Sequence, residues 1–233
     1  IDPSWNDKFA DAVLKKVLKI RWFAFMRADG ILRDEKLGIM DKLVRSGLSH
    51  ISIGAERASN SELDTIGKKC YKVDIVKGAM YILRSKYPRV FRQVTFIVGI
   101  RDETRDSMLG QLTYAKELGV DYPAFHPMTP VPGTKLWEMC KEKGLIPEKI
   151  NWKNFNLSKT TFNLSQVSQK KLEEIWKDFL NLVLERNPGM APKNVLKVAI
   201  KHPKKAIKRV IENPKAISII LKSDNTWKEA IKE

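Results

Sequence analysis

Residues 92–100 read RQVTFIVGI, an apolar run rich in β-formers that ends on a glycine. The same pattern recurs at 20–29 (IRWFAFMRAD), at 50–56 (HISIGAE) and at 121–134 (DYPAFHPMTPVPGT). Helical periodicity separates the four runs, which predicts an α/β fold with parallel strands and right-handed crossovers. In such folds, ligands lie at the carboxyl ends of the strands. The polar residues that end each run are therefore candidate site residues, and their placement favours an enzyme.

The helices expected around these strands follow from caps and apolar spacing. They run from a cap at Asn6 or Asp7 to about Lys19, over 34–45, from Ser61, and over 73–86, 106–118, 134–143 and 168–185. Four strands are too few to close a barrel, so the sheet is open or belongs to a larger barrel. No GxGxxG or GxxxxGK[ST] follows a strand, so dinucleotide-fold or P-loop binding has no support.

The composition is that of a globular protein, with 233 residues of which 43% are hydrophobic. Cys70 and Cys140 are the only cysteines, and they lack metal-type spacing. They indicate a reducing cytoplasm and argue against a zinc or iron–sulfur site built wholly from this chain. Because the sequence opens on Ile1 rather than Met, we expect it to begin within a domain.

The basic charge is concentrated at the C-terminal end. Residues 188–233 hold eleven Lys or Arg against four Asp or Glu, within a chain of net charge +16. An eleven-residue repeat begins at Pro192, Pro203 and Pro214, which predicts three short amphipathic helices. This extension fits either an anionic membrane surface or a helical cap whose lysines face water. Nucleic acid is not expected as a partner, because the segment lacks interleaved aromatics for stacking.

The polar residues at the four strand ends share one expected edge of the sheet. They are Arg27, Asp29, Glu56, Ser59, Gly99, Asp102, Glu103 and residues 129–134. Several of these residues also have a structural interpretation that needs no ligand. Arg27 and Asp29 form a natural salt bridge, Glu56 can cap the helix that begins at Ser61, and PVPG is a rigid turn.

In order and spacing these residues resemble the radical S-adenosylmethionine (SAM) superfamily, and most closely its cobalamin-dependent branch. The matching segments are DPSWN at 2–6, RAD at 27–29, Leu37, Met40 and Gly47, IGAERAS at 53–59, Leu63 and Lys68, FIVG at 96–99, ET at 103–104 and TPVPGT at 129–134. The resemblance covers roughly residues 1–145.

The resemblance implies a partial (β/α)6 barrel, with about its last four strands in residues 1–145. A linker and an amphipathic helix at 146–187 would pack on it, followed by an all-helical extension at 188–233. The implied activity is SAM binding with a 4Fe–4S cluster for radical-based methyl transfer, cyclisation or related chemistry. The CxxxCxxC cluster ligands would lie upstream of Ile1, so this chain alone is expected to be inactive.

Further cofactors and partners follow from the same resemblance. They are cobalamin as an option, an electron donor such as ferredoxin or flavodoxin, and a small-molecule or lipid-like substrate. The alternative is a non-catalytic basic module on a degenerate barrel that binds a membrane or another anion. The expected location is cytoplasmic, and membrane-peripheral if the basic extension lies on lipid.

The resemblance also implies cofactor-binding roles, whereas no catalytic residue and no metal ligand is assigned. Asp2 would contact the methionine amino group, Glu56 and Ser59 the methionine and ribose part, Gly99 the adenine and Arg27 the SAM carboxylate. Pro130 would border the cofactor from the TPVPGT turn. His126 and Tyr122 on the fourth strand are candidates for substrate contact, and packing is the simpler interpretation of both.

Overall fold

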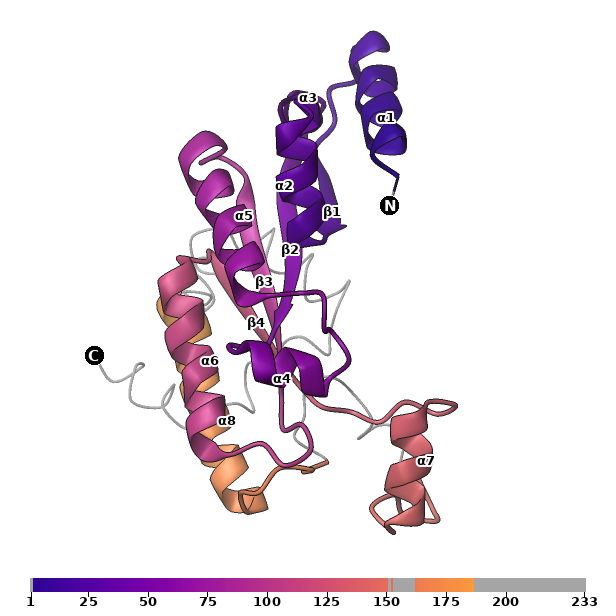
Figure 1. Cartoon of the computed structure of the whole chain (residues 1–233), viewed down its shortest axis with the longest axis vertical. Coiled ribbons are helices and arrows are strands. Elements are labelled where there is room, and N and C mark those ends of the chain that lie inside the picture. Colours follow the sequence, from indigo (N-terminus) through magenta and orange to yellow (C-terminus); the bar gives the residue numbers. More distant parts are fainter. Residues whose placement is uncertain (1, 151, 153–161, 187–233) are drawn as a thin grey trace, which may run out of the picture. The chain divides into compact units, whose positions relative to one another are not determined.

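A computed structural model of the chain describes residues 2–150, 152 and 162–186. Four strands, β1 (Trp22–Met26), β2 (Leu48–Glu56), β3 (Phe91–Val98) and β4 (Tyr122–Pro127), form a parallel sheet in the order β1-β2-β3-β4 (Figure 1). The predicted α/β class and parallel strand direction are confirmed. The membership of this sheet in a partial barrel stays a prediction.

Eight helices are seen among the described residues. They are α1 (Pro3–Lys15), α2 (Ala28–Lys36), α3 (Ile39–Arg45), α4 (Asn60–Thr65), α5 (Val73–Lys86), α6 (Arg105–Leu118), α7 (Lys135–Glu142) and α8 (Gln169–Arg186). α5 has the predicted bounds, and α6 ends as predicted at Gly119 in the left-handed conformation.

Two helix predictions are wrong at their starts. The cap of α1 is Asp2, whose carboxylate accepts from the Ser4 N–H, because Pro3 can occupy the first turn. The helix expected over 34–45 is two helices that begin at Ala28 and break at Gly38, whose φ of +71° suits glycine. Apolar spacing alone does not reveal a break of this kind.

The chain divides into two units, residues 1–182 and 183–233. Only 183–186 of the second are described, as the last turn of α8. The Pro-led repeat and its lysines lie outside the described residues, and the domain boundaries at 145 and 187 stay predictions. No helix within the described ranges is long and apolar enough to cross a membrane.

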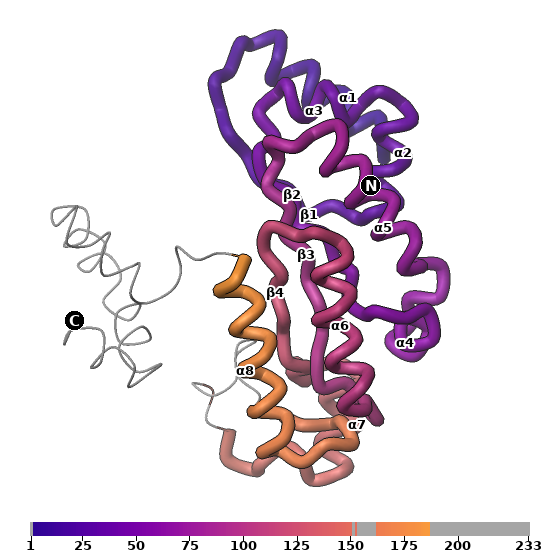
Figure 2. Tube along the Cα trace, turned by 90° about the vertical axis from the view of Figure 1, so that its left-hand side faces the viewer, coloured from indigo at the N-terminus to yellow at the C-terminus, as the bar shows by residue number. Residues whose placement is uncertain are grey.

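The core of residues 1–182 lies on one face of the sheet. Ile53 of β2 and Phe96 of β3 are fully buried on that face. Phe125 of β4 stacks on Phe96 at 5.1 Å and meets Phe179 of α8 at 4.2 Å. In Figure 2 the tube of α6 runs along β3, and α8 runs beside β4. These contacts fix the strand ends on which the candidate site is built.

Candidate functional site

Strand register brings the predicted site residues to one edge of the sheet. Met26 pairs with Ile53 and Val98 pairs with Pro127. Arg27 and Gly99 therefore follow their strands at the same edge as Glu56, the last residue of β2. Neighbouring strands lie about 4.8 Å apart, so these residues form a row along the edge.

Glu56 sits at an irregularity where β2 leaves its register with β3. Its φ is +66°, in the left-handed region that glycine normally occupies. The carboxylate folds back over the strand, and a Cβ at Gly54 would lie 2.5 Å from Glu56 Oε1. The glycine of the IGAE segment therefore makes room for the carboxylate. Lys68 Nζ donates to Glu56 Oε1 at 2.8 Å.

Tyr71 links the end of β1 to this ion pair. Its hydroxyl accepts from the Ala28 N–H at 3.3 Å. Its ring lies beneath two cations, the Arg27 guanidinium at 5.1 Å and the Lys68 ammonium at 5.3 Å. Burial raises the pKa of Tyr71 to about 12, so the hydroxyl stays protonated at neutral pH. Tyr71 was not predicted as a site residue, and the matched motif residue Lys68 is the sequence signal that lies near it.

Arg27 and Asp29 form the expected salt bridge. Arg27 donates from Nε to Asp29 Oδ1 at 2.9 Å and from Nη2 to Oδ2 at 2.8 Å. Hydrogen bonds from Arg27 lower the pKa of Asp29, which is charged near neutral pH. Both side chains are about half exposed, so an anionic ligand can reach this guanidinium from solvent.

Gly99 has a φ of +79°, as its position in the turn requires, but its amide is already engaged. The Gly99 N–H donates to Glu103 Oε2 at 2.5 Å, and the Ile100 N–H donates to the same oxygen at 3.1 Å. Glu103 is buried and pairs with Arg57 at 2.5 Å. Arg57, which is fully buried, donates to the Ile97 carbonyl at 2.6 Å. Arg57 and Glu103 thus tie together the ends of β2 and β3.

The other three predicted residues serve local structure. Ser59, rather than Glu56, is the N-cap of α4 and accepts from the Glu62 N–H. Asp2 caps α1, and its hydrogen bonds with Ser4 lower the pKa of its carboxyl. Pro130 is buried in the segment between β4 and α7. Among the described interactions, none joins these three residues to Arg27 or Glu56.

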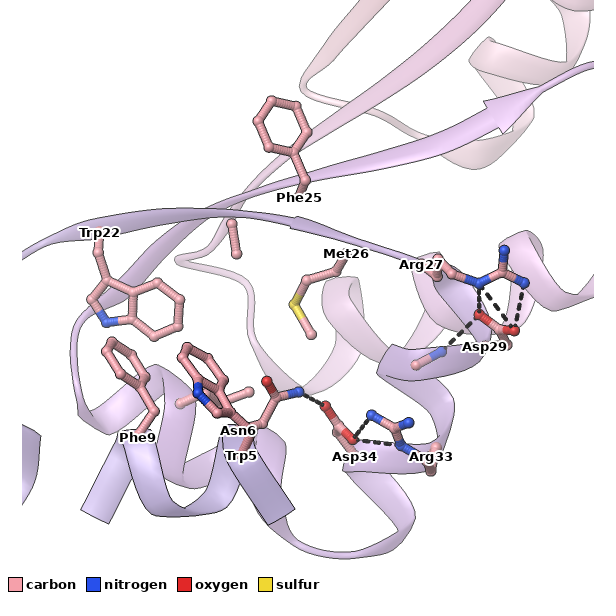
Figure 3. A pocket seen from close by; sticks show the side chains of 13 residues that line it. Trp5, Asn6, Phe9, Trp22, Phe25, Met26, Arg27, Asp29, Arg33 and Asp34 are labelled. Atoms are coloured by element: carbon pink, nitrogen blue, oxygen red, sulfur yellow. Dashed lines mark hydrogen bonds and ion pairs between the residues drawn. The ribbon is translucent and has the colours of Figure 1, made fainter. Parts of the chain in front are cut away.

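A pocket of about 450 Å³ lies beside β1, between the strand and helices α1, α2 and α3 (Figure 3). Its polar side is formed by Asn6, Arg27, Asp29, Arg33 and Asp34, and its apolar side includes Trp5, Phe9, Trp22, Met26 and Leu43. Asp34 is fully buried and accepts from Asn6 Nδ2 at 2.6 Å and from Arg33. Arg27 and Asp29 therefore connect the strand-end row to this pocket, which periodicity alone does not reveal.

The residues present do not fit an iron–sulfur cluster. Such clusters are held by several cysteine thiolates. Here Cys70, which directly precedes Tyr71 in the sequence, is exposed. Cys140 is buried in α7, and burial raises the pKa of its thiol. Within the part of the chain that the structure describes, no group of three His, Cys, Asp or Glu side chains could hold a metal ion.

Known proteins similar to this chain are named as enzymes. It is 29% identical over 199 residues to an uncharacterized methyltransferase of Pyrococcus horikoshii, covering 83% of this chain and 39% of that protein. It is 28% identical over 136 residues to the anaerobic magnesium-protoporphyrin IX monomethyl ester cyclase of Rubrivivax gelatinosus, covering 58% and 24%. It is 23% identical over 190 residues to the bacteriochlorophyllide d C-12(1)-methyltransferase of Chlorobaculum tepidum, covering 81% and 39%. No family model matches the chain.

These similarities support an enzyme whose relatives carry out methyl transfer or cyclisation. The chain spans less than half the length of each of these relatives.

Proposed function

We propose that the carboxyl edge of this sheet binds the methionine part of SAM, within an enzyme of methyl transfer or cyclisation. The observation that carries the proposal is the arrangement around Tyr71. Two cations, Arg27 and Lys68, lie over one ring, and each has its own carboxylate partner, Asp29 and Glu56.

This arrangement suits an amino-acid zwitterion. The methionine part of SAM carries one carboxylate and one ammonium group. A guanidinium or lysine ammonium can pair with the first, and Glu56 can pair with the second. Because Lys68 and Glu56 are paired at rest, a zwitterion placed between them exchanges partners with both and leaves neither charge unpaired. Arg27 holds Asp29 through Nε and Nη2 and can donate to the ligand carboxylate from Nη1. In this proposal Arg27 and Lys68 pair with the carboxylate of SAM, and Glu56 pairs with its ammonium group.

The remaining cofactor roles are proposed from the sequence resemblance. Asp2, Ser59, Gly99 and Pro130 would border the cofactor from the loops that flank the row. Because Glu103 holds the Gly99 amide, Gly99 contributes close backbone approach rather than a free donor. A 4Fe–4S cluster does not fit the cysteines present, so no step is assigned through one. Cobalamin and the electron donor rest on the resemblance alone.

The substrate class we propose is a large apolar ring system. It would bind on the open face of the sheet, which is the face opposite the core. Phe23, Phe25 and Phe91 are exposed there by 43%, 74% and 38%. The Phe23 and Phe91 rings both pack edge-on against His50, at 4.6 and 4.8 Å. His50 Nε2 is buried without a hydrogen-bond partner among the described residues, so a polar substituent could pair with it. The relatives named for magnesium-protoporphyrin IX ester and bacteriochlorophyllide d favour this class.

Equilibrium dialysis with SAM tests the cofactor proposal. Glu56→Gln should weaken SAM binding by about 10- to 150-fold, because a hydrogen bond between charged groups contributes about 1.5–3 kcal/mol. Asp41→Asn is the matched control, because it removes one carboxylate of an exposed ion pair with Arg45 on α3, and it should bind as the parent does. Failure of the parent chain to bind SAM would refute the proposal. Equal affinity of Glu56→Gln and the parent would refute the role of Glu56.

A further inference from the structure

The segment that joins α1 to β1 begins with an unusual helix end. The Leu18 N–H donates to the Val13 carbonyl at 3.3 Å, and the Val17 N–H donates to the Leu14 carbonyl at 3.0 Å. These two bonds form a Schellman motif, in which the residue after the C-cap is left-handed and is usually glycine. Here that residue is Val17, with a φ of +51°.

A valine at this position works against stability. β-branched residues are strongly disfavoured at positive φ, because Cβ crowds the backbone. Val17 recovers little by burial, since 77% of the residue is exposed. A residue that strains the backbone and contacts little of the protein indicates a role for the side chain outside the folded chain.

Two neighbours repeat the exposure. Leu18 is 48% exposed and Ile20 is 42% exposed. Three aliphatic side chains within four consecutive residues therefore face solvent, at the end of the sheet where β1 begins. Contiguous exposed apolar residues of this kind mark interaction sites rather than ordinary surface.

The same segment is strongly basic. Lys15, Lys16, Lys19 and Arg21 are exposed, and none forms an ion pair with a described residue. No carboxylate occurs between residues 15 and 21. The helix dipole accounts for Lys15 and Lys16 at the end of α1, but Lys19 and Arg21 lie beyond its reach.

We propose that residues 15–21, the α1–β1 segment, dock on an anionic lipid surface. Aliphatic side chains among unpaired cations match a bilayer interface, where the apolar tips enter the acyl boundary and the cations meet the headgroups. A nucleic acid offers no apolar partner for the three aliphatic residues. The segment lies at the amino ends of the strands, so docking leaves the row at their carboxyl ends open to ligands (Figure 1).

Co-sedimentation of the whole chain with phosphatidylcholine vesicles, with and without phosphatidylserine, tests this proposal. We expect binding only with phosphatidylserine, and weaker binding at high salt. Lys19→Gln with Arg21→Gln should weaken binding by about 25-fold, since each cation near such a surface contributes about five-fold. Tyr81→Ser removes another exposed apolar side chain, on α5, and should leave binding unchanged.

Val17→Gly separates docking from folding. Glycine relieves the backbone, so this variant should melt at a higher temperature and yet bind vesicles more weakly. Unchanged vesicle binding by both the Val17→Gly and the Lys19→Gln/Arg21→Gln variants would overturn the proposal. This holds also if residues 188–233 account for that binding, because the α1–β1 segment would then contribute nothing to it. Lipid-free dimerisation that these substitutions abolish would also overturn it, since the segment would then contact a second copy of the chain.

Discussion

Lys68 Nζ lies 2.8 Å from Glu56 Oε1, which joins a loop lysine to the last residue of β2. Both groups are partly shielded, with side-chain exposures of 35% and 17%. Glu56 also has a positive φ that no other residue of β2 shares. The pair therefore holds a strained strand end near Tyr71 and keeps the carboxylate folded back over Gly54.

This pair should show measurable coupling. In a double-mutant cycle of Glu56→Gln and Lys68→Met, we expect an interaction free energy of about 1 kcal/mol in urea unfolding, at the upper end for exposed pairs because both groups are shielded. The Asp41–Arg45 pair on α3, about 60% exposed at both side chains, should give about 0.3 kcal/mol. Coupling at Glu56–Lys68 no larger than at this control would contradict the prediction.

Arg57 should be among the least replaceable residues of the chain. Arg57→Met leaves the buried Glu103 charge without its guanidinium, and we expect a loss of about 3–5 kcal/mol in the free energy of unfolding. Arg45→Met, at an exposed pair, should change it by less than about 0.5 kcal/mol. Adding Glu103→Gln to Arg57→Met should recover part of the loss, because the fully buried carboxylate is then neutral and only Glu62, the partly exposed second partner of Arg57, stays charged. A loss under about 1 kcal/mol for Arg57→Met would show that Glu103 finds another partner.

Two glycines should respond in opposite directions to alanine. Gly47 has a φ of +106°, and a Cβ there would overlap the Ile20 carbonyl oxygen. Gly47→Ala should therefore cost about 2–4 kcal/mol. Gly110 lies within α6 with no atom near the added methyl group, so Gly110→Ala should gain about 0.5–1 kcal/mol. Thermal unfolding of both variants checks the signs, and a stabilising Gly47→Ala would contradict the strained turn.

Alkaline pH should weaken the Tyr71 site. Burial raises the pKa of Tyr71 from 10.0 to about 12. The pKa of Tyr71 is higher in the folded chain than in the unfolded chain. The contribution of its buried hydroxyl to the free energy of unfolding is therefore fully present below pH 10 and is lost as the pH rises from 10 to about 12. Tyr71→Phe should make the loss of stability over this range smaller, while Tyr87 and Tyr114, whose pKa values burial also raises, still contribute to it. Absorbance titration should show that Tyr71 ionises late, and ionisation near pH 10 would refute its burial.

Several features of the fold were predictable because they depend on neighbours in sequence. The apolar runs and their polar stops located all four strands, and alternation with helices fixed their parallel direction. Gly119 marked the end of α6 because few other residues adopt its left-handed conformation readily. The start of α1 and the break at Gly38 were missed, since several residues nearby could cap or end a helix.

Less of the candidate site was predictable. The sequence placed Arg27, Glu56 and Gly99 at strand ends, and the register brings them to one edge of the sheet. Glu103 was expected to be one of the polar groups at that edge, but it is buried against Arg57 and the Gly99 turn. Whether a carboxylate at a strand end faces solvent or the core depends on packing, which local pattern does not encode.

The sequence by itself determined the order of helices and strands and the strand ends that carry polar groups, because hydrophobic periodicity and turn chemistry act over a few residues. The tertiary structure alone decided which groups meet. Lys68 reaches Glu56 across twelve residues, and the Tyr71 hydroxyl meets the Ala28 amide across forty-three. Such pairs form only when crossovers bring distant segments together, and burial there raises the pKa of Tyr71.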